Sequence, residues 1–397
     1  MKSITKQLLS DKTKYTTEII PSILPPGNYF MLGDEAAAEG AIAAGCRFFA
    51  GYPITPASEV MEQIVRRFPH VGGRFIQMED EIGSISAMIG AAWAGGKAMT
   101  ATSGPGLSLM MENLGYAAMT ETPIVIVDIQ RAGPATGQAT RPGSGDILQV
   151  KFGSHGDYEI IALSPWSVQE MYDLTISAFN LAEAYRVPAI LLADEGIGHL
   201  RENFQVSGET EVYHRPRASG LPPFHTDDPD RVPPMPAFGQ GEALLVTGST
   251  HDGRGYRKTQ DSNVHRKLVH RLVYKIRGNA QTIYKYEEYF IPEAKYLFVA
   301  YGFSARAALQ VVLELREKGI AAGLWRPITI WPFPADALKK ASDSAEAVIV
   351  PEMNYGQLAW EIQRHVQIPV HPVPQVDGEV MSPETILQYF HKTFKKE

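Results

Sequence analysis

The sequence predicts an α/β protein with a doubly wound, mostly parallel sheet and a second, smaller α/β domain. Two observations lead to this prediction. Short apolar runs alternate with segments whose apolar residues recur at helical spacing, first over residues 29–210 and again over 295–397. Such alternation is typical of parallel sheets covered by helices. The length of 397 residues, with 44% hydrophobic residues, is too great for one typical domain and sufficient for two.

The strands and helices of the first domain follow one another from residue 34 to residue 194. The run PIVIVDIQ is almost continuously β-branched, as expected of a strand buried on both faces of a sheet. We predict strands over 47–52, 74–79, 98–103, 123–130, 158–165 and 188–194. We predict helices over 34–45, 57–67, 80–96, 107–121 and 168–186.

The alternation stops after about residue 204 and resumes near residue 295. Residues 214–242 are dense in Pro and Gly, which indicates an irregular connection. We divide the chain into an N-terminal arm (1–28), a first domain (29–210), a Pro-rich connection with a helix over 262–278 (211–294) and a C-terminal α/β domain (295–397). In the last of these we predict strands over 295–302, 321–329 and 345–352 and helices over 304–319, 334–342 and 356–366.

Composition argues against several classes of protein. The net charge is −7 and no stripe of Lys and Arg runs along the chain, so a nucleic-acid partner is not expected. Residues 265–278 are locally basic, and we interpret them as a solvated helix face. A single cysteine, Cys46, excludes a disulfide framework and a cysteine-bound cluster within the chain; we expect a buried structural thiol. No run resembles a signal peptide or a membrane span, so we expect a cytoplasmic protein without a membrane partner.

A first candidate site residue lies in FFAGYPITPASE, where Thr55 stands between Pro53 and Pro56. Proline fixes its own φ and restricts the residue before it, so the hydroxyl of Thr55 is held in a rigid turn between a strand and a helix. Ligands bind at such turns in open α/β sheets. An ordinary turn stiffened by proline fits the same spacing.

Two further strand ends carry polar or small residues. Glu79, Asp80 and Glu81 begin a helix, where the dipole favours carboxylates. The helix that follows is almost uncharged, so one carboxylate could instead be drawn into a buried interface. The turn at 103–106, Ser-Gly-Pro-Gly, could accept an anion at a helix N-terminus, although a plain turn explains it equally well. It matches neither a Walker loop nor GxGxxG.

The fourth candidate is the loop that begins at Arg131, after the most apolar strand. Three glycines and two prolines follow within twelve residues, and Thr140 and Arg141 lie in the same loop. A planar guanidinium binds carboxylates and phosphates bidentately, so the loop resembles an anion clamp. An arginine that merely caps the sheet edge is the alternative.

Other polar residues give weaker signals. His155 could be a ligand or a base, and Glu352 or Asn354 could present a side chain at another strand end, where helix capping is an equal explanation. The chain has no GxSxG, HExxH or kinase signature. The residues alone describe a ligand-binding α/β protein with an anion clamp and an incomplete catalytic set.

Five stretches in this order resemble the α subunit of 2-oxoacid:ferredoxin oxidoreductases, closest to the 2-oxoglutarate branch: GYPITPASE, IQMEDEIGSISAMIGAAWAG, ATSGPGLSLMMENLGYAAMTE, QRAGPATGQAT and VPEMNYGQLAWEI. The resemblance covers residues 29–205 and 243–397. It implies a domain like the pyrimidine-binding domain of thiamine enzymes. It also implies oxidative decarboxylation of a 2-oxoacid with coenzyme A, giving acyl-CoA, CO2 and two electrons for ferredoxin.

The resemblance implies partners as well. Thiamine diphosphate would be shared with a β subunit that holds the diphosphate and Mg²⁺ through a Gly-Asp-Gly motif, which this sequence lacks. Iron–sulfur clusters would sit on partner subunits, and no metal is expected in this chain. The family further implies γ and ferredoxin-like δ subunits, and a dimer of αβ units.

Four residues match positions with roles in the family. The resemblance implies that Glu81 bonds the aminopyrimidine ring of thiamine diphosphate and is catalytic, that Arg131 pairs with the substrate carboxylate, and that Thr55 and Thr140 contact the substrate. Ala132 and Ala139 stand where the family usually has Gly and Pro. The alternatives are therefore another 2-oxoacid (pyruvate, branched-chain or aryl) or a non-catalytic anion-binding protein; the YPITP turn argues against a transketolase-like enzyme.

Overall fold

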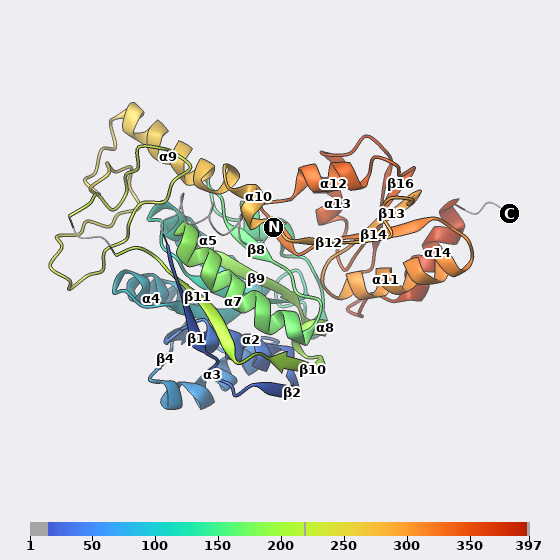
Figure 1. Cartoon of the computed structure of the whole chain (residues 1–397), viewed down its shortest axis with the longest axis horizontal. Coiled ribbons are helices and arrows are strands. Elements are labelled where there is room, and N and C mark those ends of the chain that lie inside the picture. Colours follow the sequence, from blue (N-terminus) through green and yellow to red (C-terminus); the bar gives the residue numbers. More distant parts are fainter. Residues whose placement is uncertain (1–14, 218–219, 395–397) are drawn as a thin grey trace.

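An eight-stranded, mostly parallel sheet forms the larger part of this computed structural model, which describes residues 15–217 and 220–394 (Figure 1). The neighbouring strands of the sheet are, in order, β15 (Thr329–Trp331), β8 (Ile161–Leu163), β9 (Ala189–Asp194), β6 (Val125–Ala132), β5 (Ala98–Thr102), β3 (Phe48–Gly51) and β4 (Arg74–Gln77), with β7 (Gln138–Pro142) paired to β6. Pairs within β8 to β4 are parallel, whereas β15 and β7 pair antiparallel with their neighbours. The doubly wound, mostly parallel sheet is confirmed.

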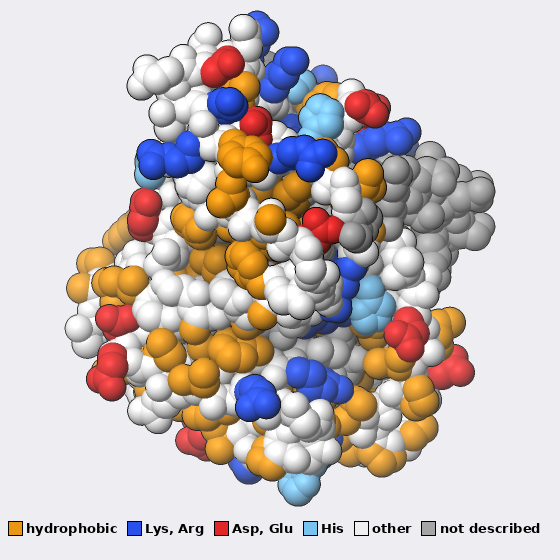
Figure 2. Space-filling model, turned by 90° about the vertical axis from the view of Figure 1, so that its left-hand side faces the viewer, with side chains coloured by type: hydrophobic (Ala, Val, Ile, Leu, Met, Phe, Trp, Pro, Cys, Tyr) orange, Lys and Arg blue, Asp and Glu red, His pale blue; other side chains and the backbone are white. Residues whose placement is uncertain are grey.

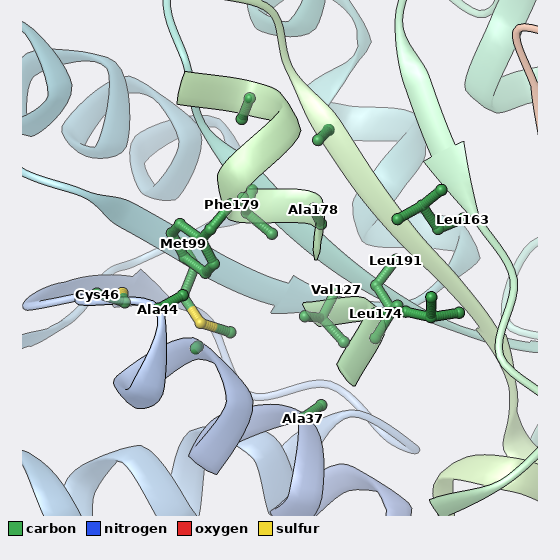
Figure 3. Packing of buried hydrophobic residues seen from close by; sticks show 14 of the residues in the cluster. Ala37, Ala44, Cys46, Met99, Val127, Leu163, Leu174, Ala178, Phe179 and Leu191 are labelled. Carbon is green, nitrogen blue, oxygen red and sulfur yellow. The ribbon is translucent and has the colours of Figure 1, made fainter. Parts of the chain in front are cut away.

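Helices cover both faces of this sheet. One core cluster contains residues of α2 (Gly33–Ala43), α3 (Ser58–Val71) and α7 (Val168–Tyr185), and a second contains residues of α4 (Glu81–Trp93) and α5 (Gly104–Met119). Alanines and glycines let α2 approach α7 closely: a Cβ atom at Gly40 would collide with the backbone carbonyl of Tyr172. Members of the first cluster labelled in Figure 3 include Ala37, Val127, Leu174, Ala178 and Leu191.

The smaller domain is built on a second sheet, which lies beside the first as a separate lobe (Figure 1). Its strands are, in order, β12 (Tyr286–Tyr289), β14 (Ala322–Pro327), β13 (Tyr296–Val299), β16 (Ala347–Glu352) and β17 (Val370–Pro374). All pairs are parallel except β12 with β14. Its helices are α11 (Gly302–Glu317), α12 (Ala335–Ala341), α13 (Gln357–Gln363) and α14 (Pro383–Phe394).

The folded units differ from the division expected from sequence. In the expected arm, β1 (Thr16–Pro21) pairs with β11 (Glu209–His214), and β2 (Gly27–Leu32) pairs with β10 (Arg201–Val206); residues 1–14 of that arm lie outside the described residues. Strand β12 falls in the expected connection but belongs to the small sheet, and β15 falls in the expected second domain but joins the large one. Strand pairing across the boundaries therefore ties the segments together.

The basic segment near residue 270 forms α9 (Ser262–Arg277), and it is not the fully solvated face we expected. Lys and Arg side chains gather on the upper part of the face shown in Figure 2. Arg271 and Lys275, however, are buried, and both bind Glu121, at 2.5 and 3.0 Å. Although burial opposes ionisation, these two cations lower the pKa of Glu121 to about 2. The helix is thus anchored by a buried ion cluster.

Strand order places two topological switch points in the molecule. In the large sheet β3 lies between β4 and β5, so the connection that leaves β3 runs to one side of the sheet and the connection that leaves β5 runs to the other. In the small sheet β13 lies likewise between β14 and β16. Ligands bind beyond the carboxyl ends of strands at such points. None of the helices in residues 15–217 and 220–394 is long and apolar enough to cross a membrane.

Candidate active site

The turn after β3 and the last residues of β6 meet at the carboxyl edge of the large sheet; Arg131, expected to begin a loop, is still part of β6. Arg131 is 9% exposed and its Nη1 donates a hydrogen bond of 2.7 Å to the backbone carbonyl of Thr55. Its Nε is buried without a hydrogen-bond partner among the described residues. The structure therefore brings these two predicted residues together and leaves part of the guanidinium available for an anion.

Glu81 separates from its acidic neighbours at the start of α4. Asp80 is exposed and caps the helix by accepting a hydrogen bond from the Gly83 amide at 2.7 Å, and Glu79 is exposed as well. Glu81 is only 5% exposed, and burial raises its pKa. Burial thus distinguishes Glu81 from a carboxylate that is merely placed in solvent at a helix start, as Glu79 and Asp80 are.

The Ser-Gly-Pro-Gly turn makes room for Glu81. A Cβ atom at Gly106 would lie 2.8 Å from Glu81 Cγ and would collide with Glu81 Oε1 and Thr102 Oγ1. The second glycine of the turn is thus required by the close approach of a carboxyl group. The close approach of Glu81 therefore accounts for a glycine at position 106, and no anion at the N-terminus of α5 is needed to explain it.

A cavity of about 540 Å³ opens between this edge and the small domain. Its walls come from the turn at 104–105, residues 131–135, residues 142–149 and the residues that follow β16. Arg131 is the only basic side chain among the lining residues, and Asp146 is the only acidic one. Tyr355 and Trp360 contribute aromatic surface and are 75% and 59% exposed. The cavity suits a small anion with an apolar part.

Two neighbouring carboxyl groups, those of Asp128 and Asp146, lie beside the cavity, and Asp146 is one of its lining residues. Asp128 is fully buried and Asp146 is half-buried, and neither oxygen of Asp128 has a hydrogen-bond partner among the described residues. Burial raises the pKa of Asp146 to about 6, and burial together with the neighbouring Asp146 raises the pKa of Asp128 well above its usual value of 3.8. Both shifts oppose the ionisation of two neighbouring carboxyl groups near Arg131.

Asn354 ties the small domain to the cavity wall. Its Nδ2 donates to the Ser144 carbonyl at 2.6 Å, and its Oδ1 accepts from the amides of Gly356 and Gln357. Glu352 does not line the cavity; it accepts hydrogen bonds from two amides of α13 and one from Tyr301 Oη. Asn354 thus both caps a helix and faces the cavity, whereas Glu352 is a buried support.

Of the four residues assigned from the family resemblance only Arg131 lines the cavity; Thr55, Glu81 and Thr140 are not among its lining residues. Thr140 is exposed on β7, the strand that pairs with β6 at Arg131. Arg141 pairs with Glu379 on the surface at 2.9 Å. His155 is 87% exposed and lies 3.6 Å from Glu112, as expected of a surface histidine. A role for Thr140 stays a prediction.

Sequence reasoning missed Asp146, Ser144 and Tyr301. One signal was available for the carboxyl pair, because Asp128 interrupts an otherwise apolar strand, and a charge in such a position is rare unless it has a role or a partner. Ser144 and Tyr301 gave no local signal, since their partners come from other segments.

Two family models match this chain. The model described as pyruvate flavodoxin/ferredoxin oxidoreductase, thiamine diphosphate-binding, matches residues 39–271, and that described as pyruvate:ferredoxin oxidoreductase core domain II matches residues 294–386.

Curated relatives include 2-oxoglutarate synthase subunit KorA of Methanocaldococcus jannaschii, which is 52% identical over 362 residues, covering 90% of this chain and 97% of that protein. Ketoisovalerate oxidoreductase subunit VorB of Methanothermobacter thermautotrophicus is 40% identical over 334 residues, covering 83% of this chain and 88% of that protein.

The fold also matches solved structures. The 2-oxoglutarate:ferredoxin oxidoreductase of Magnetococcus marinus, solved with 2-oxoglutarate, coenzyme A and succinyl-CoA bound, superposes with a TM-score of 0.84 at 31% identity. The match covers 92% of this chain and 65% of that chain. A split-gene transketolase matches with a TM-score of 0.51 at 13% identity, over 91% of this chain and 97% of that chain, which shows a shared fold alone.

Proposed function

Because the chain belongs to the 2-oxoacid:ferredoxin oxidoreductase family, among the α subunits of its 2-oxoglutarate synthase branch, we propose that it provides the substrate side of a thiamine diphosphate-dependent active site. The reaction is the conversion of 2-oxoglutarate and coenzyme A to succinyl-CoA and CO2, with two electrons passed to ferredoxin. The observation that supports this most directly concerns Arg131, which is buried at the cavity edge beside Thr55 and whose Nε has no hydrogen-bond partner among the described residues.

Arg131 is proposed to bind the carboxylate next to the 2-oxo group. One of its nitrogens holds the Thr55 carbonyl, which fixes the guanidinium plane, and the remaining donors can pair with a carboxylate in a fork. The Thr55 hydroxyl makes no hydrogen bond within the described residues, so it is available to the substrate. Arg131 and Thr55 would thereby orient a small, flexible acid before any bond breaks.

Glu81 is proposed to face the pyrimidine ring of thiamine diphosphate. The cofactor, when bound, supplies the carbanion that attacks the 2-oxo carbon and accepts the electrons left by decarboxylation. Glu81 fits a ring nitrogen because it is buried, has a raised pKa and is accommodated by Gly106. Its task is to hold a proton at that nitrogen, which a carboxyl group that stays fully ionised in water would do less well.

A partner subunit is proposed to close the site. Apolar side chains remain exposed around the carboxyl edge, next to the residues proposed to act: Tyr52 after β3, Ile82 beside Glu81, Leu109 in the second turn of α5, and the cavity residues Tyr355 and Trp360. We propose a β subunit that carries the diphosphate, Mg²⁺ and an iron–sulfur cluster, with γ and ferredoxin-like δ subunits as further partners, in a dimer of αβ units.

A branched-chain 2-oxoacid is the second candidate substrate. Apart from Arg131, the lining of the cavity within the described residues offers no basic side chain for a second carboxylate, and Trp360, Tyr355 and Val376 make part of it apolar. A dicarboxylate would need a cation from the partner.

The test is dye reduction by the complex of this chain with its partner subunits. We expect viologen reduction that requires coenzyme A and prefers 2-oxoglutarate over pyruvate and 3-methyl-2-oxobutanoate. Preference for the last of these would transfer the assignment to the branched-chain acids. A colourless chain that recruits no partner and no thiamine diphosphate would refute the proposal and favour a non-catalytic anion-binding protein.

A further inference from the structure

Three side chains able to bind a metal converge behind the turn that carries Thr55. They are Asp34 in the first turn of α2, Glu59 in the first turn of α3, and His199, which ends the short helix α8 (Glu195–Gly198). One possible ligand atom from each lies within 4.8 Å of the other two. These residues belong neither to the cavity nor to the residues proposed to act on the substrate.

Asp34 is the strongest sign that the cluster holds something. The side chain is fully buried, and neither carboxylate oxygen has a hydrogen-bond partner among the described residues. It is packed so tightly against α8 that a Cβ atom at Gly198 would lie 2.6 Å from Asp34 Oδ1. An ionised, buried carboxylate without hydrogen bonds is costly unless a cation compensates its charge, and burial accordingly raises the pKa of Asp34 in the absence of an ion. Glu59 repeats the pattern, since its Oε2 is buried and accepts no hydrogen bond.

His199 is oriented like a metal ligand. Its Nδ1 lies 3.2 Å from Glu195 Oε1, a carboxylate oxygen that can accept a proton held on this nitrogen. Its Nε2 then faces oxygens alone, with the Pro56 carbonyl at 3.2 Å and Glu59 Oε2 at 3.4 Å. A carboxylate that fixes the tautomer of a histidine whose other nitrogen points at further ligands is the usual arrangement around a bound metal.

From this convergence we infer that Asp34, Glu59 and His199 bind a divalent first-row transition ion, Zn²⁺ or Mn²⁺, with the Pro56 carbonyl as a further ligand. A mixture of one imidazole with carboxylate oxygens suits these ions better than Mg²⁺ or Ca²⁺, which prefer oxygen alone. Bonds of about 2.0–2.2 Å place ligand atoms roughly 3–4 Å apart, so the cluster needs only a small contraction to close around an ion.

A proton on Nε2 is the competing explanation. That proton would be donated to the Pro56 carbonyl or to Glu59, and a second proton would neutralise Asp34, whose pKa burial raises. Both oxygens of Asp34 would still lack a hydrogen-bond partner among the described residues, whereas one cation can bind all of these groups. The side chains of His199 and Glu59 are 31% and 35% exposed, so an ion can enter from solvent. This site in the chain itself departs from our expectation that metals sit only on partner subunits.

The ion would hold the far side of the Thr55 turn. Pro56 directly follows Thr55, and Glu59 lies one turn of helix further on, while Arg131 binds the Thr55 carbonyl from the other side. Removing the ion should therefore raise the KM for the 2-oxoacid more than it lowers kcat. This consequence rests on the proposed function, but occupancy of the site does not.

The test measures metal content and metal binding in the complex of this chain with its partner subunits. Mg²⁺ and thiamine diphosphate are kept saturating so that their site stays filled, and iron is ignored because of the expected clusters. After mild chelation and addition of Zn²⁺ or Mn²⁺, elemental analysis should find one tightly held ion per chain in the wild type and in Glu62→Gln, an exposed change on the same helix. Asp34→Asn and His199→Gln should lose it, and Glu195→Gln should weaken Mn²⁺ binding by roughly 10- to 100-fold in an EPR titration.

If the wild type, Asp34→Asn and His199→Gln all hold the same amount of Zn²⁺, and likewise of Mn²⁺, the metal site is refuted and protonation remains as the explanation. If Asp34→Asn does not fold, His199→Gln and Glu195→Gln decide the question alone. A bound ion in an enzyme whose KM does not respond to its removal would leave the site standing and refute its effect on the turn. Because binding is read without turnover, failure of the site is distinguishable from failure of the proposed reaction.

Discussion

Replacing Gly106 with alanine tests whether the position of the Glu81 carboxyl group limits turnover. The new Cβ atom would lie 2.8 Å from Glu81 Cγ and nearer still to Glu81 Oε1 and Thr102 Oγ1, whereas real Cβ contacts are essentially never shorter than 3.0 Å. Thr102 is fully buried in β5, so Glu81 must withdraw by about half an ångström or more. Misplacement by about 1 Å costs on the order of 10² in rate; we expect kcat to fall roughly 10- to 100-fold.

The assay is viologen reduction at saturating 2-oxoglutarate and coenzyme A, with bound thiamine diphosphate measured separately. Gly90→Ala is the matched control, because an added Cβ there meets nothing within 4 Å in an exposed part of α4; it should keep full activity and gain up to about 1 kcal/mol of stability. Glu81→Gln keeps the shape but not the titrating group, and should lose roughly 10²–10³ in rate. Normal turnover in both Gly106→Ala and Glu81→Gln would refute the assigned role of Glu81.

Three further substitutions test the cavity residue Arg131, the buried ion cluster around Glu121, and the buried carboxyl group of Glu352 at the end of β16. Arg131→Lys keeps the charge but loses the planar fork, so kcat/KM should fall roughly tenfold to a hundredfold for every 2-oxoacid in steady-state assays; a loss confined to 2-oxoglutarate would assign Arg131 to the distal carboxylate. Glu121→Gln leaves Arg271 and Lys275 buried without their counter-ion, so urea unfolding should show a loss of about 3–5 kcal/mol, and an unchanged midpoint would contradict this. Burial raises the pKa of Glu352 from 4.5 to about 7, so its stabilising effect is complete below pH 4.5 and is lost as the pH rises through 7. Unfolding free energies measured against pH should show the wild type losing about 3 kcal/mol relative to Glu352→Gln over this range. If the curves of the two proteins run parallel between pH 5 and 7, Glu352 is not the group that titrates.

Most helices and central strands could be predicted because their apolar residues follow a local period. The helices expected over 168–186 and 262–278 appear as α7 and α9 within one residue of those bounds. The strands β1 and β2 could not be predicted in this way. Their side chains are exposed or half-buried, so no alternation of buried and exposed residues marks them, and their partners β11 and β10 lie roughly 170 to 200 residues away along the chain.

The candidate site was predictable where a strand end carries an unusual residue, and not where distant segments meet. Arg131 follows the most apolar strand, and Glu81 opens an almost uncharged helix, so both could be singled out. Ser144 and Asn354 are 210 residues apart and become partners only because the two sheets are docked. Burial also separates Glu81 from Asp80, a distinction that depends on the packing of α4 against α5 and cannot be read from three consecutive acidic residues.

The two switch points of the fold explain why the small domain is part of the site. The large sheet supplies Arg131 from the end of β6 and Thr55 from the turn after β3, and the segment beyond Arg131 turns back as β7 before it reaches Ser144. The residues after β16 supply the missing wall: Asn354 binds the Ser144 carbonyl, and Gln357 donates to the Gly145 carbonyl at 2.6 Å. These bonds fix the far end of the same segment that begins at Arg131. The fold thus makes the geometry of the anion clamp depend on how the two sheets are docked.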